Sequence, residues 1–355
     1  MLKIIVPLLL TASVSQAAES IRIYNWADYI APDTLTNFQA ATGISTHSDV
    51  YDSNEMLDAK LMAGRSGYDI VVPSNHFMTH QIKAGALQKL DKSQLPNWQN
   101  LNPVLLKALQ VNDPDNQYGF PYMWGTTGIG YNVEKVKAAL GDQVPLDSWD
   151  LIFKPENLKK LSQCGVAVLD NGPEMLPIAL HYLGLPHHSK NPEDYQKAEA
   201  LLMQMRSNVT YFHSSKYVSD LANGDICVAV GFSGDVLQAA AAAGDKVKID
   251  YILPKEGAPI WFDMLAMPAD APNQPAAYAF MNYLLEPKVI ASISDYLHYA
   301  NGNAQADALV DPTLKADPKV YPPEAVIGSL YPLEAMPLKI DRLRTRIWSK
   351  VKNGA

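Results

Sequence analysis

The sequence predicts an α/β protein with two lobes, each built on a central sheet flanked by helices. Strand and helix patterns alternate along residues 19–72 and again along 166–243, which is typical of a sheet covered by helices. The chain is expected to pass between the two regions more than once, a layout that permits hinge motion. A length of 355 residues fits about two domains, and 48% hydrophobic residues suffice for two cores.

Residues 19–43 predict the first strand, loop and helix. Ile21 and Ile23 alternate with a polar residue, as in a half-buried strand, and Gly43 can end the helix that starts near Asp33. The loop between them carries large aromatics and an acid at the edge where α/β sheets bind ligands. The other elements expected in this lobe are strands at 44–50, 68–72 and 262–267 and helices at 53–61 and 276–285.

Residues 120–132 predict a long strand that runs from the first lobe into the second. Its three glycines favour the backbone changes that a hinge needs. The other elements expected in the second lobe are strands at 166–169 and 226–230 and helices at 175–183, 193–205, 236–243 and 340–352. Residues 251–254 are expected to cross back. The predicted lobes are therefore 19–130 plus 254–300, and 131–253 plus 301–355.

The first 18 residues predict a secretory signal peptide. Lys3 gives a basic start, an apolar run extends from Ile4 to Leu10, and small residues precede a cleavage point after Ala17 or Ala18. The apolar run is too short to span a membrane. We therefore expect a soluble exported protein.

Charge and cysteine content narrow the classes of partner. The formal net charge is −8, and it becomes −9 once Lys3 is removed with the predicted signal peptide. An acidic chain disfavours nucleic acid and anionic lipid and favours cationic solutes. The two cysteines, Cys164 and Cys227, predict a disulfide in an oxidising compartment, and two unpaired buried thiols are the other interpretation.

Motifs for catalysis or cofactor binding are not recognisable in the sequence. GxSxG, HExxH, GxxxxGK and GxGxxG are all absent. His181, His187 and His188 gather loosely around one loop, where a solvated turn is the better interpretation and a metal site the minor one. We therefore expect no enzyme activity, no cofactor and no metal ion.

Acids recur beside aromatic residues at the expected ends of strands and starts of helices. They are Asp28, Glu174, Asp235 and Asp263. Each alone has an ordinary explanation as a helix cap, a first-turn acid or a turn residue. Their recurrence in both lobes favours a cationic ligand, because a carboxylate balances an ammonium charge and each aromatic face attracts a cation by about 0.5–2 kcal/mol.

Several segments together resemble the periplasmic polyamine-binding proteins of bacterial ABC importers, the group that binds putrescine and spermidine. The resemblance extends through essentially the whole chain after the signal peptide. Its segments are IYNWADYI (23–30), YDSNE (51–55), YDIVVPS (68–74), TTGIGYN (126–132), FHSSKY (212–217), LANGDICVAVGFSGDV (221–236), LPKEGA (253–258) and WFDMLAMPADA (261–271).

The resemblance implies the two-lobed fold of a periplasmic binding protein, with the ligand in the cleft between the lobes. Acids would bind ammonium groups, rings would form an aromatic box, and the two cysteines would form a disulfide. The implied ligand-binding residues are Trp26, Asp28, Tyr29, Ser74, Glu174, Phe232, Asp235, Trp261, Asp263 and Tyr299. The implied partners of this periplasmic monomer are a polyamine and an inner-membrane ABC permease with its ATPase.

Three positions bear on which polyamine is bound. Ala27 stands where putrescine binders can carry Ser, Phe232 where some members have Trp, and Trp261 where some have Phe. Moving bulk from one wall of the cleft to another would change the ligand length that the cleft admits. This arrangement is more similar to the spermidine-preferring members, so spermidine is favoured over putrescine, and affinity for both remains an option.

Three other functions stay open. The chain could bind another solute such as a sugar, an amino acid or ferric ion, although sugars gain less from several acids and ferric sites use paired tyrosines. It could be an exported enzyme on the same scaffold, but no nucleophile–base pair supports this. Its closed form could also be recognised by a sensor instead of a permease.

Overall fold

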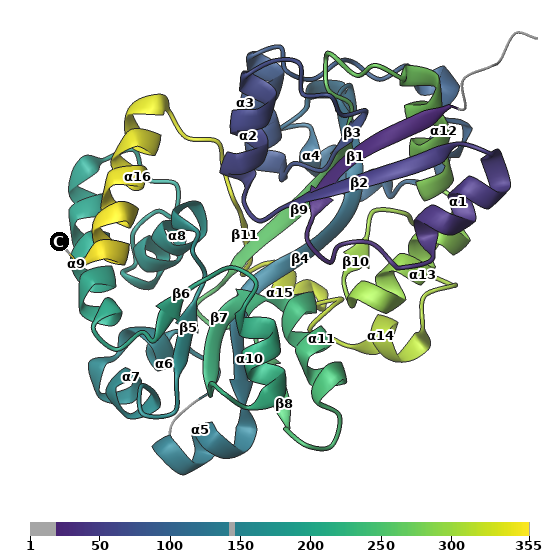
Figure 1. Ribbon diagram of the computed structural model, residues 1–355. Helices are drawn as coiled ribbons and strands as arrows, with labels where there is room; N and C mark the ends of the chain where they lie inside the picture. Colours follow the sequence, from purple (N-terminus) through teal and green to yellow (C-terminus); the bar gives the residue numbers. More distant parts are fainter. Residues whose placement is uncertain (1–18, 142–145, 355) are drawn as a thin grey trace, which may run out of the picture.

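The computed structural model describes residues 19–141 and 146–354, which form two lobes side by side (Figure 1). Residues 1–18, predicted to be the signal peptide, lie outside the described residues. Within the described ranges, no helix is both long enough and apolar enough to cross a membrane.

Among the described residues, eleven strands form one mixed sheet that runs through both lobes. They are β1 (Ser20–Trp26), β2 (Ser45–Tyr51), β3 (Ile70–Val71), β4 (Gly119–Asn132), β5 (Val166–Val168), β6 (Tyr211–Phe212), β7 (Val228–Phe232), β8 (Ile249–Ile252), β9 (Pro259–Ala266), β10 (Ala300–Asn301) and β11 (Tyr331–Pro332). The main path is β2-β1-β3-β9-β4-β7-β5-β6, with β8 and β10 paired to β4 and β11 paired to β9. Parallel pairs lie at the two ends of this path, and antiparallel pairs surround β4 and β9 in the middle.

Helices cover the sheet in both lobes (Figure 1). Those beside the first lobe are α1 (Thr34–Thr42), α2 (Asn54–Met62), α3 (Asn75–Lys83), α4 (Pro103–Leu109), α12 (Gln274–Leu284), α13 (Pro287–Leu297) and α14 (Pro312–Ala316), with 3-10 turns η1 (Lys92–Gln94), η2 (Pro96–Asn100) and η3 (Pro114–Asn116). The remaining helices are α5 (Val133–Leu140), α6 (Asp150–Phe153), α7 (Pro155–Leu161), α8 (Gly172–Tyr182), α9 (Pro192–Arg206), α10 (Tyr217–Asn223), α11 (Ser233–Ala243), α15 (Glu324–Ile327) and α16 (Leu338–Asn353).

Local signals in the sequence place the first helices as predicted. Gly43 adopts φ 76° and ends α1, a conformation that costs glycine little. The Ser53 side chain accepts a hydrogen bond from the Met56 backbone N–H and so begins α2. Phe38 of α1 is fully buried against the first lobe, which fixes the helix beside the sheet.

Two separate hydrophobic cores define the lobes. The chain crosses between them three times: along β4 between Trp124 and Ile129, at the start of β9, and between Tyr321 and Leu330. Phe232 packs against both cores. The two lobes are therefore joined at three points of the sequence, and a site at their junction can draw residues from distant parts of the chain.

β4 crosses between the lobes as predicted and is buried along its whole length. The sequence predicts that its glycines serve a hinge. Gly125 has no positive φ, however, and a Cβ atom there would lie 2.7 Å from the Trp261 ring on β9. In this conformation glycine is required at Gly125 because the Trp261 ring fills the space between β4 and β9.

Two predicted boundaries differ from the structure. The sequence predicts residues 301–355 in the second lobe, but Ala306, Val310, Leu314 and Val320 are buried in the first core. They follow β10, which pairs with the first-lobe part of β4, so the chain packs there before it crosses. Residues 251–254 are predicted to cross back, yet β8 pairs with the second-lobe end of β4, and the crossing comes at β9.

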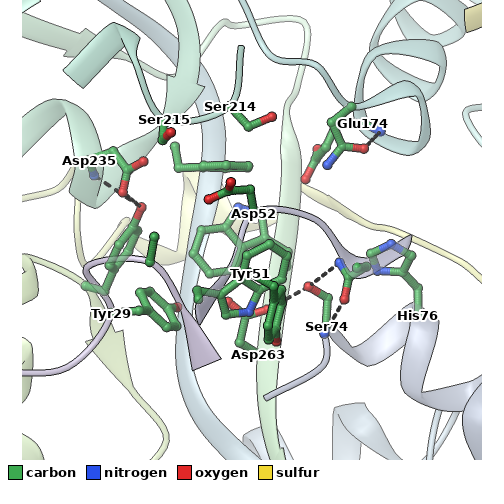
Figure 2. A pocket seen from close by; sticks show the side chains of 17 residues that line it. Tyr29, Tyr51, Asp52, Ser74, His76, Glu174, Ser214, Ser215, Asp235 and Asp263 are labelled. Carbon is green, nitrogen blue, oxygen red and sulfur yellow. Dashed lines mark hydrogen bonds between the residues drawn. The ribbon is translucent and has the colours of Figure 1, made fainter. Parts of the chain in front are cut away.

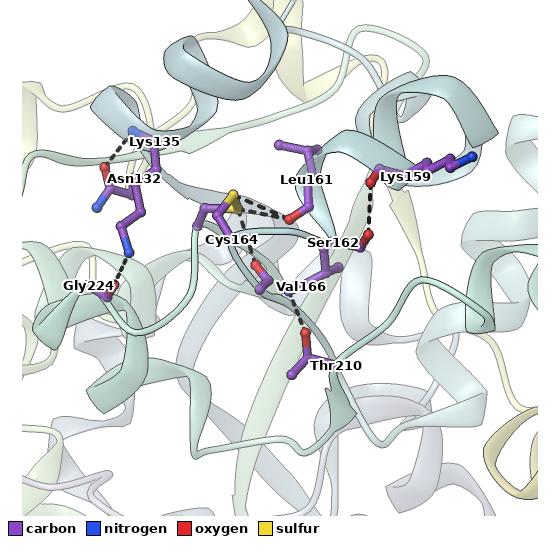
Figure 3. The surroundings of a disulfide bond; sticks show 11 residues. Asn132, Lys135, Lys159, Leu161, Ser162, Cys164, Val166, Thr210 and Gly224 are labelled. Atoms are coloured by element: carbon purple, nitrogen blue, oxygen red, sulfur yellow. Dashed lines mark hydrogen bonds between the residues drawn. A yellow bond between two sulfur atoms is a disulfide. The ribbon is translucent and has the colours of Figure 1, made fainter.

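The predicted disulfide between Cys164 and Cys227 is confirmed (Figure 3). It joins the residues just before β5 and β7, whose Cα atoms are 5.4 Å apart, across a sequence separation of 63. Cys227 is fully buried in the second core. The bridge therefore ties together two neighbouring strands of the sheet that carries the second half of the site.

Candidate functional site

A cavity of about 90 Å³ lies where the two lobes meet (Figure 2). Its volume exceeds the minimum that a single water needs, which is about 10–15 Å³ on the same measure. Both lobes contribute its walls. Nine of the ten predicted ligand-binding residues line it: Trp26, Tyr29, Ser74, Glu174, Phe232, Asp235, Trp261, Asp263 and Tyr299.

Asp28 is the predicted site residue that does not line the cavity. The loop after β1 turns at Asp28, where φ is 51°, and the Asp28 side chain is exposed whereas Tyr29 is buried. Trp26 is held in place by a hydrogen bond from its indole Nε1 to the Val72 carbonyl at 2.9 Å. The left-handed turn explains why adjacent residues of one loop face opposite environments.

Asp263 provides a buried carboxyl from the first lobe. It lies within β9, not at the strand start that the sequence predicts. The Ser74 hydroxyl donates a 2.6 Å hydrogen bond to Asp263, and Asn54 holds Ser74 by two hydrogen bonds of 3.0 Å. Burial raises the pKa of Asp263 to about 7, because the Ser74 hydrogen bond offsets only part of the lost hydration.

Asp235 provides a second carboxyl, from the first turn of α11. It accepts hydrogen bonds from the Tyr299 hydroxyl at 2.7 Å and the Tyr217 hydroxyl at 2.8 Å. Glycine at 234 permits this arrangement, since a Cβ atom there would lie 2.6 Å from the Tyr299 ring. Burial raises the pKa of Asp235 despite these two donors.

Glu174 provides the third carboxyl, from the first turn of α8. The Asn171 side chain begins this helix by accepting a hydrogen bond from the Glu174 backbone N–H at 3.2 Å. The Thr127 hydroxyl donates to the Glu174 carboxyl, also at 3.2 Å. Glu174 is only 3% exposed, and burial raises its pKa to about 8, so at neutral pH it is mostly protonated.

Aromatic rings close the cavity between these carboxyls. Trp261 packs edge-on against Phe232 at 5.6 Å and against Tyr299 at 5.3 Å. Tyr299 in turn meets Tyr29 at 5.6 Å. The indole Nε1 of Trp261 is buried without a hydrogen-bond partner in the described protein, and such a group ordinarily finds its partner in a ligand or a water.

The charge of the cavity wall has one sign. Its lining residues, all within the described ranges, include no Lys or Arg. His76 also lines the cavity, and burial lowers its pKa to about 3, so this imidazole is uncharged at neutral pH. Arg344 lowers the pKa of Glu174 electrostatically but does not line the cavity, so the acids of the wall suit a ligand that supplies positive charge.

Eight lining residues are not among the predicted ligand-binding residues, although Ala27 is one of the three positions expected to bear on the choice of polyamine. They are Ala27, Tyr51, Asp52, Asn54, His76, Asn171, Ser214 and Ser215. Several directly follow the ends of β2 and β6, where the same rule that pointed to the loop after β1 applies. Applied to the predicted strand at 44–50, that rule would have found Asp52, but it could not have found Ser214, because no strand is predicted at the position of β6. His76 lies in the first turn of α3, as Glu174 and Asp235 do in α8 and α11, but it was not selected because it is not an acid.

Comparisons with known proteins agree with this architecture. The family model described as bacterial extracellular solute-binding protein matches residues 33–322. A putrescine-binding periplasmic protein of Pseudomonas aeruginosa is 56% identical over 348 residues, covering 97% of this chain and 95% of that protein. The putrescine-binding periplasmic protein of Escherichia coli is 54% identical over 340 residues, covering 95% and 92%.

The similarity extends to a second curated group and to solved structures. The spermidine/putrescine-binding periplasmic protein of Escherichia coli is 33% identical, with 88% of this chain and 86% of that protein covered. The structure of a putative spermidine/putrescine ABC transporter from Listeria monocytogenes has a TM-score of 0.86 at 31% identity, covering 95% of this chain and 100% of that chain. The predicted two-lobed periplasmic binding protein fold is confirmed, and the chain belongs to the bacterial extracellular solute-binding proteins.

Proposed function

We propose that this chain is a periplasmic receptor that captures polyamines and delivers them to an ABC permease driven by its ATPase. The observation that carries the proposal is the set of three carboxyls, two buried (Glu174 and Asp263) and one half-buried (Asp235), around one cavity whose lining includes no Lys or Arg. The names of the curated relatives with 56% and 54% identity point to the same ligand class. We propose no catalytic step, in keeping with these relatives.

The arrangement of the carboxyls suits a ligand with a positive charge at each end. Figure 2 shows Asp235 and Glu174 on opposite sides of the cavity, with Asp263 below them. Ammonium groups of the ligand would bind these acids as charge-assisted hydrogen bonds. The rings of Trp261 and Tyr299 would cover its methylene chain and attract its charges by about 0.5–2 kcal/mol per contact.

Our proposal has putrescine as the preferred polyamine and spermidine as a second ligand. The sequence-based preference for spermidine assumes that Phe232 and Trp261 stand on different walls of the cleft. In the structure these two rings contact each other at 5.6 Å, so their exchange does not by itself lengthen the cavity. The relatives named for putrescine alone are also more similar to this chain than the 33% identical spermidine/putrescine binder.

Capture follows from the position of the acids on both lobes. Asp263 belongs to the first lobe, and Asp235 and Glu174 belong to the second, so one ligand bridges the lobes and stabilises a closed form. The permease then recognises that form. A sensor that reads the same closed form is the second candidate partner. We also propose that the chain acts as a monomer after its signal peptide is removed.

A thermal-shift panel tests the ligand class. Putrescine, cadaverine and spermidine are compared with sugars, amino acids and monoacetylated putrescine, which keeps the chain length but has one ammonium group. We expect the diamines to raise the melting temperature and the acetylated compound to do so far less, because it leaves one carboxyl without a partner. Stabilisation by sugars or neutral amino acids alone would refute the proposal, and calorimetry would rank putrescine against spermidine.

A further inference from the structure

Two histidines and a glutamate converge on the surface of the second lobe, away from the cavity. His187 and His188 lie in the loop between α8 and α9, and Glu334 follows β11. His188 Nδ1 lies 3.2 Å from His187 Nε2 and 3.6 Å from a Glu334 carboxylate oxygen. All three ligand atoms lie within 4.8 Å of one another, and no other group of this kind occurs in the part of the chain that the structure describes.

Two of the three spacings, 3.2 Å and 3.6 Å, match the coordination sphere of a small divalent ion, and the third is no more than 4.8 Å. Zn²⁺ binds imidazole nitrogens and carboxylate oxygens at about 2.0–2.2 Å, which places two tetrahedral ligand atoms about 3.3 Å apart. We propose that His187, His188 and Glu334 bind a divalent transition-metal ion, Zn²⁺ being the best match. Three protein ligands leave a fourth position open to water.

The surroundings hold one of the ligands in place. The His187 ring stacks on Tyr331 with centroids 4.3 Å apart and planes at 24°, and Tyr331 is itself buried. His181 also lies against Tyr331, but its Nε2 contacts the Glu256 carbonyl at 2.5 Å. His181 is therefore a neighbour of the site and not a fourth ligand.

The proposed ion would join two segments that are far apart in the sequence. The loop of His187 belongs to the second lobe, whereas Glu334 lies just beyond the third crossing between the lobes. An ion there would fasten the end of this crossing to the second lobe before α16 begins. None of the three ligands lines the cavity, so metal binding and polyamine binding can be measured independently.

The test is a zinc titration of the untagged full chain after treatment with a chelator, with a chromophoric chelator as competitor. We expect one equivalent of Zn²⁺ for the wild type and a loss of affinity of about tenfold or more for His188→Ala and Glu334→Gln. His47→Ala removes an exposed histidine elsewhere and serves as the matched control with unchanged affinity. Co²⁺ in place of Zn²⁺ should give the visible spectrum of tetrahedral coordination in the wild type and His47→Ala but not in His188→Ala or Glu334→Gln.

Polyamine binding verifies that the variants are folded, since their putrescine affinity should equal that of the wild type. Zn²⁺ should also raise the melting temperature of the wild type more than that of His188→Ala. In the alternative, the three residues only contact one another, through the hydrogen bond between the rings and the ion pair to Glu334, and form no metal site. The wild type would then bind Zn²⁺ no better than the two variants do. Equal Zn²⁺ affinity in wild type and variants would therefore overturn the proposal.

Discussion

Polyamine binding should release protons, because two carboxyls of the cavity hold them in the ligand-free protein. Burial raises the pKa of Glu174 to about 8 and that of Asp263 to about 7. At pH 7 these groups are then about nine-tenths and about half protonated. A diammonium ligand that binds both in their ionised form releases on the order of one to two protons from them.

The same pKa values set the pH dependence of affinity. Between pH 6 and pH 8 the ligand remains charged, since alkylammonium groups titrate near 10, while the two carboxyls ionise. The affinity for putrescine should therefore rise on the order of several hundredfold over this range. For Glu174→Gln, in which only Asp263 still titrates, the rise should fall to about tenfold.

Isothermal titration calorimetry in two buffers of different ionisation enthalpy measures the proton count directly. At pH 7 the wild type should release more protons than Glu174→Gln or Asp263→Asn, because each variant lacks one of the two carboxyls that hold a proton in the ligand-free protein. Asp245→Asn, which removes an exposed acid outside the cavity, should match the wild type. Heats that do not depend on the buffer, together with a flat affinity from pH 6 to pH 8, would refute the reasoning.

Three further outcomes are expected. The folded pKa of Glu174 lies above its unfolded value, so the ligand-free protein should lose stability as pH rises from about 4.5 to about 8. Denaturation of Glu174→Gln should show a smaller loss over this range. An equal dependence of unfolding free energy on pH in both proteins would contradict this. Reduction of the Cys164–Cys227 bridge should cost about 4 kcal/mol by the chain-entropy model for its separation of 63, measured by urea unfolding with and without reductant, and no shift in the midpoint would argue against it. Gly234→Ala should lower stability by about 1–3 kcal/mol and weaken putrescine binding, because its Cβ would meet the Tyr299 ring at 2.6 Å; wild-type behaviour in both assays would show that the ring can move without consequence.

Much of the fold was predictable because its signals are local. Gly43 ends α1 and Ser53 begins α2 as their residue types predict. The apolar run at 226–230 marks β7 as a buried strand. The burial of Ala306 and Val320 in the first core was not predictable in this way. It depends on where the chain next crosses from one lobe to the other, which no local signal reveals.

The candidate site was predictable to the extent that its residues follow strand ends or carry the resemblance. The predicted place of Asp28 in the cavity is wrong because its φ of 51° turns the side chain to solvent. The adjacent residues in the sequence do not reveal such a turn. His76 and Glu334 acquire their surroundings only through contacts between distant segments. The positions of Phe232 and Trp261 were known, but their mutual contact was not, and that contact decides how they are interpreted.

Calorimetric titration of putrescine at pH 8 into the wild type, Asp263→Asn and Asp245→Asn tests the central claim most directly. Asp263 is buried in the cavity wall and Asp245 is exposed outside it. Loss of the buried carboxylate should weaken binding by about 2–5 kcal/mol, or about 30-fold to several-thousand-fold, whereas Asp245→Asn should bind nearly as the wild type does. Equal putrescine affinity in wild type and Asp263→Asn would contradict polyamine capture at this cavity.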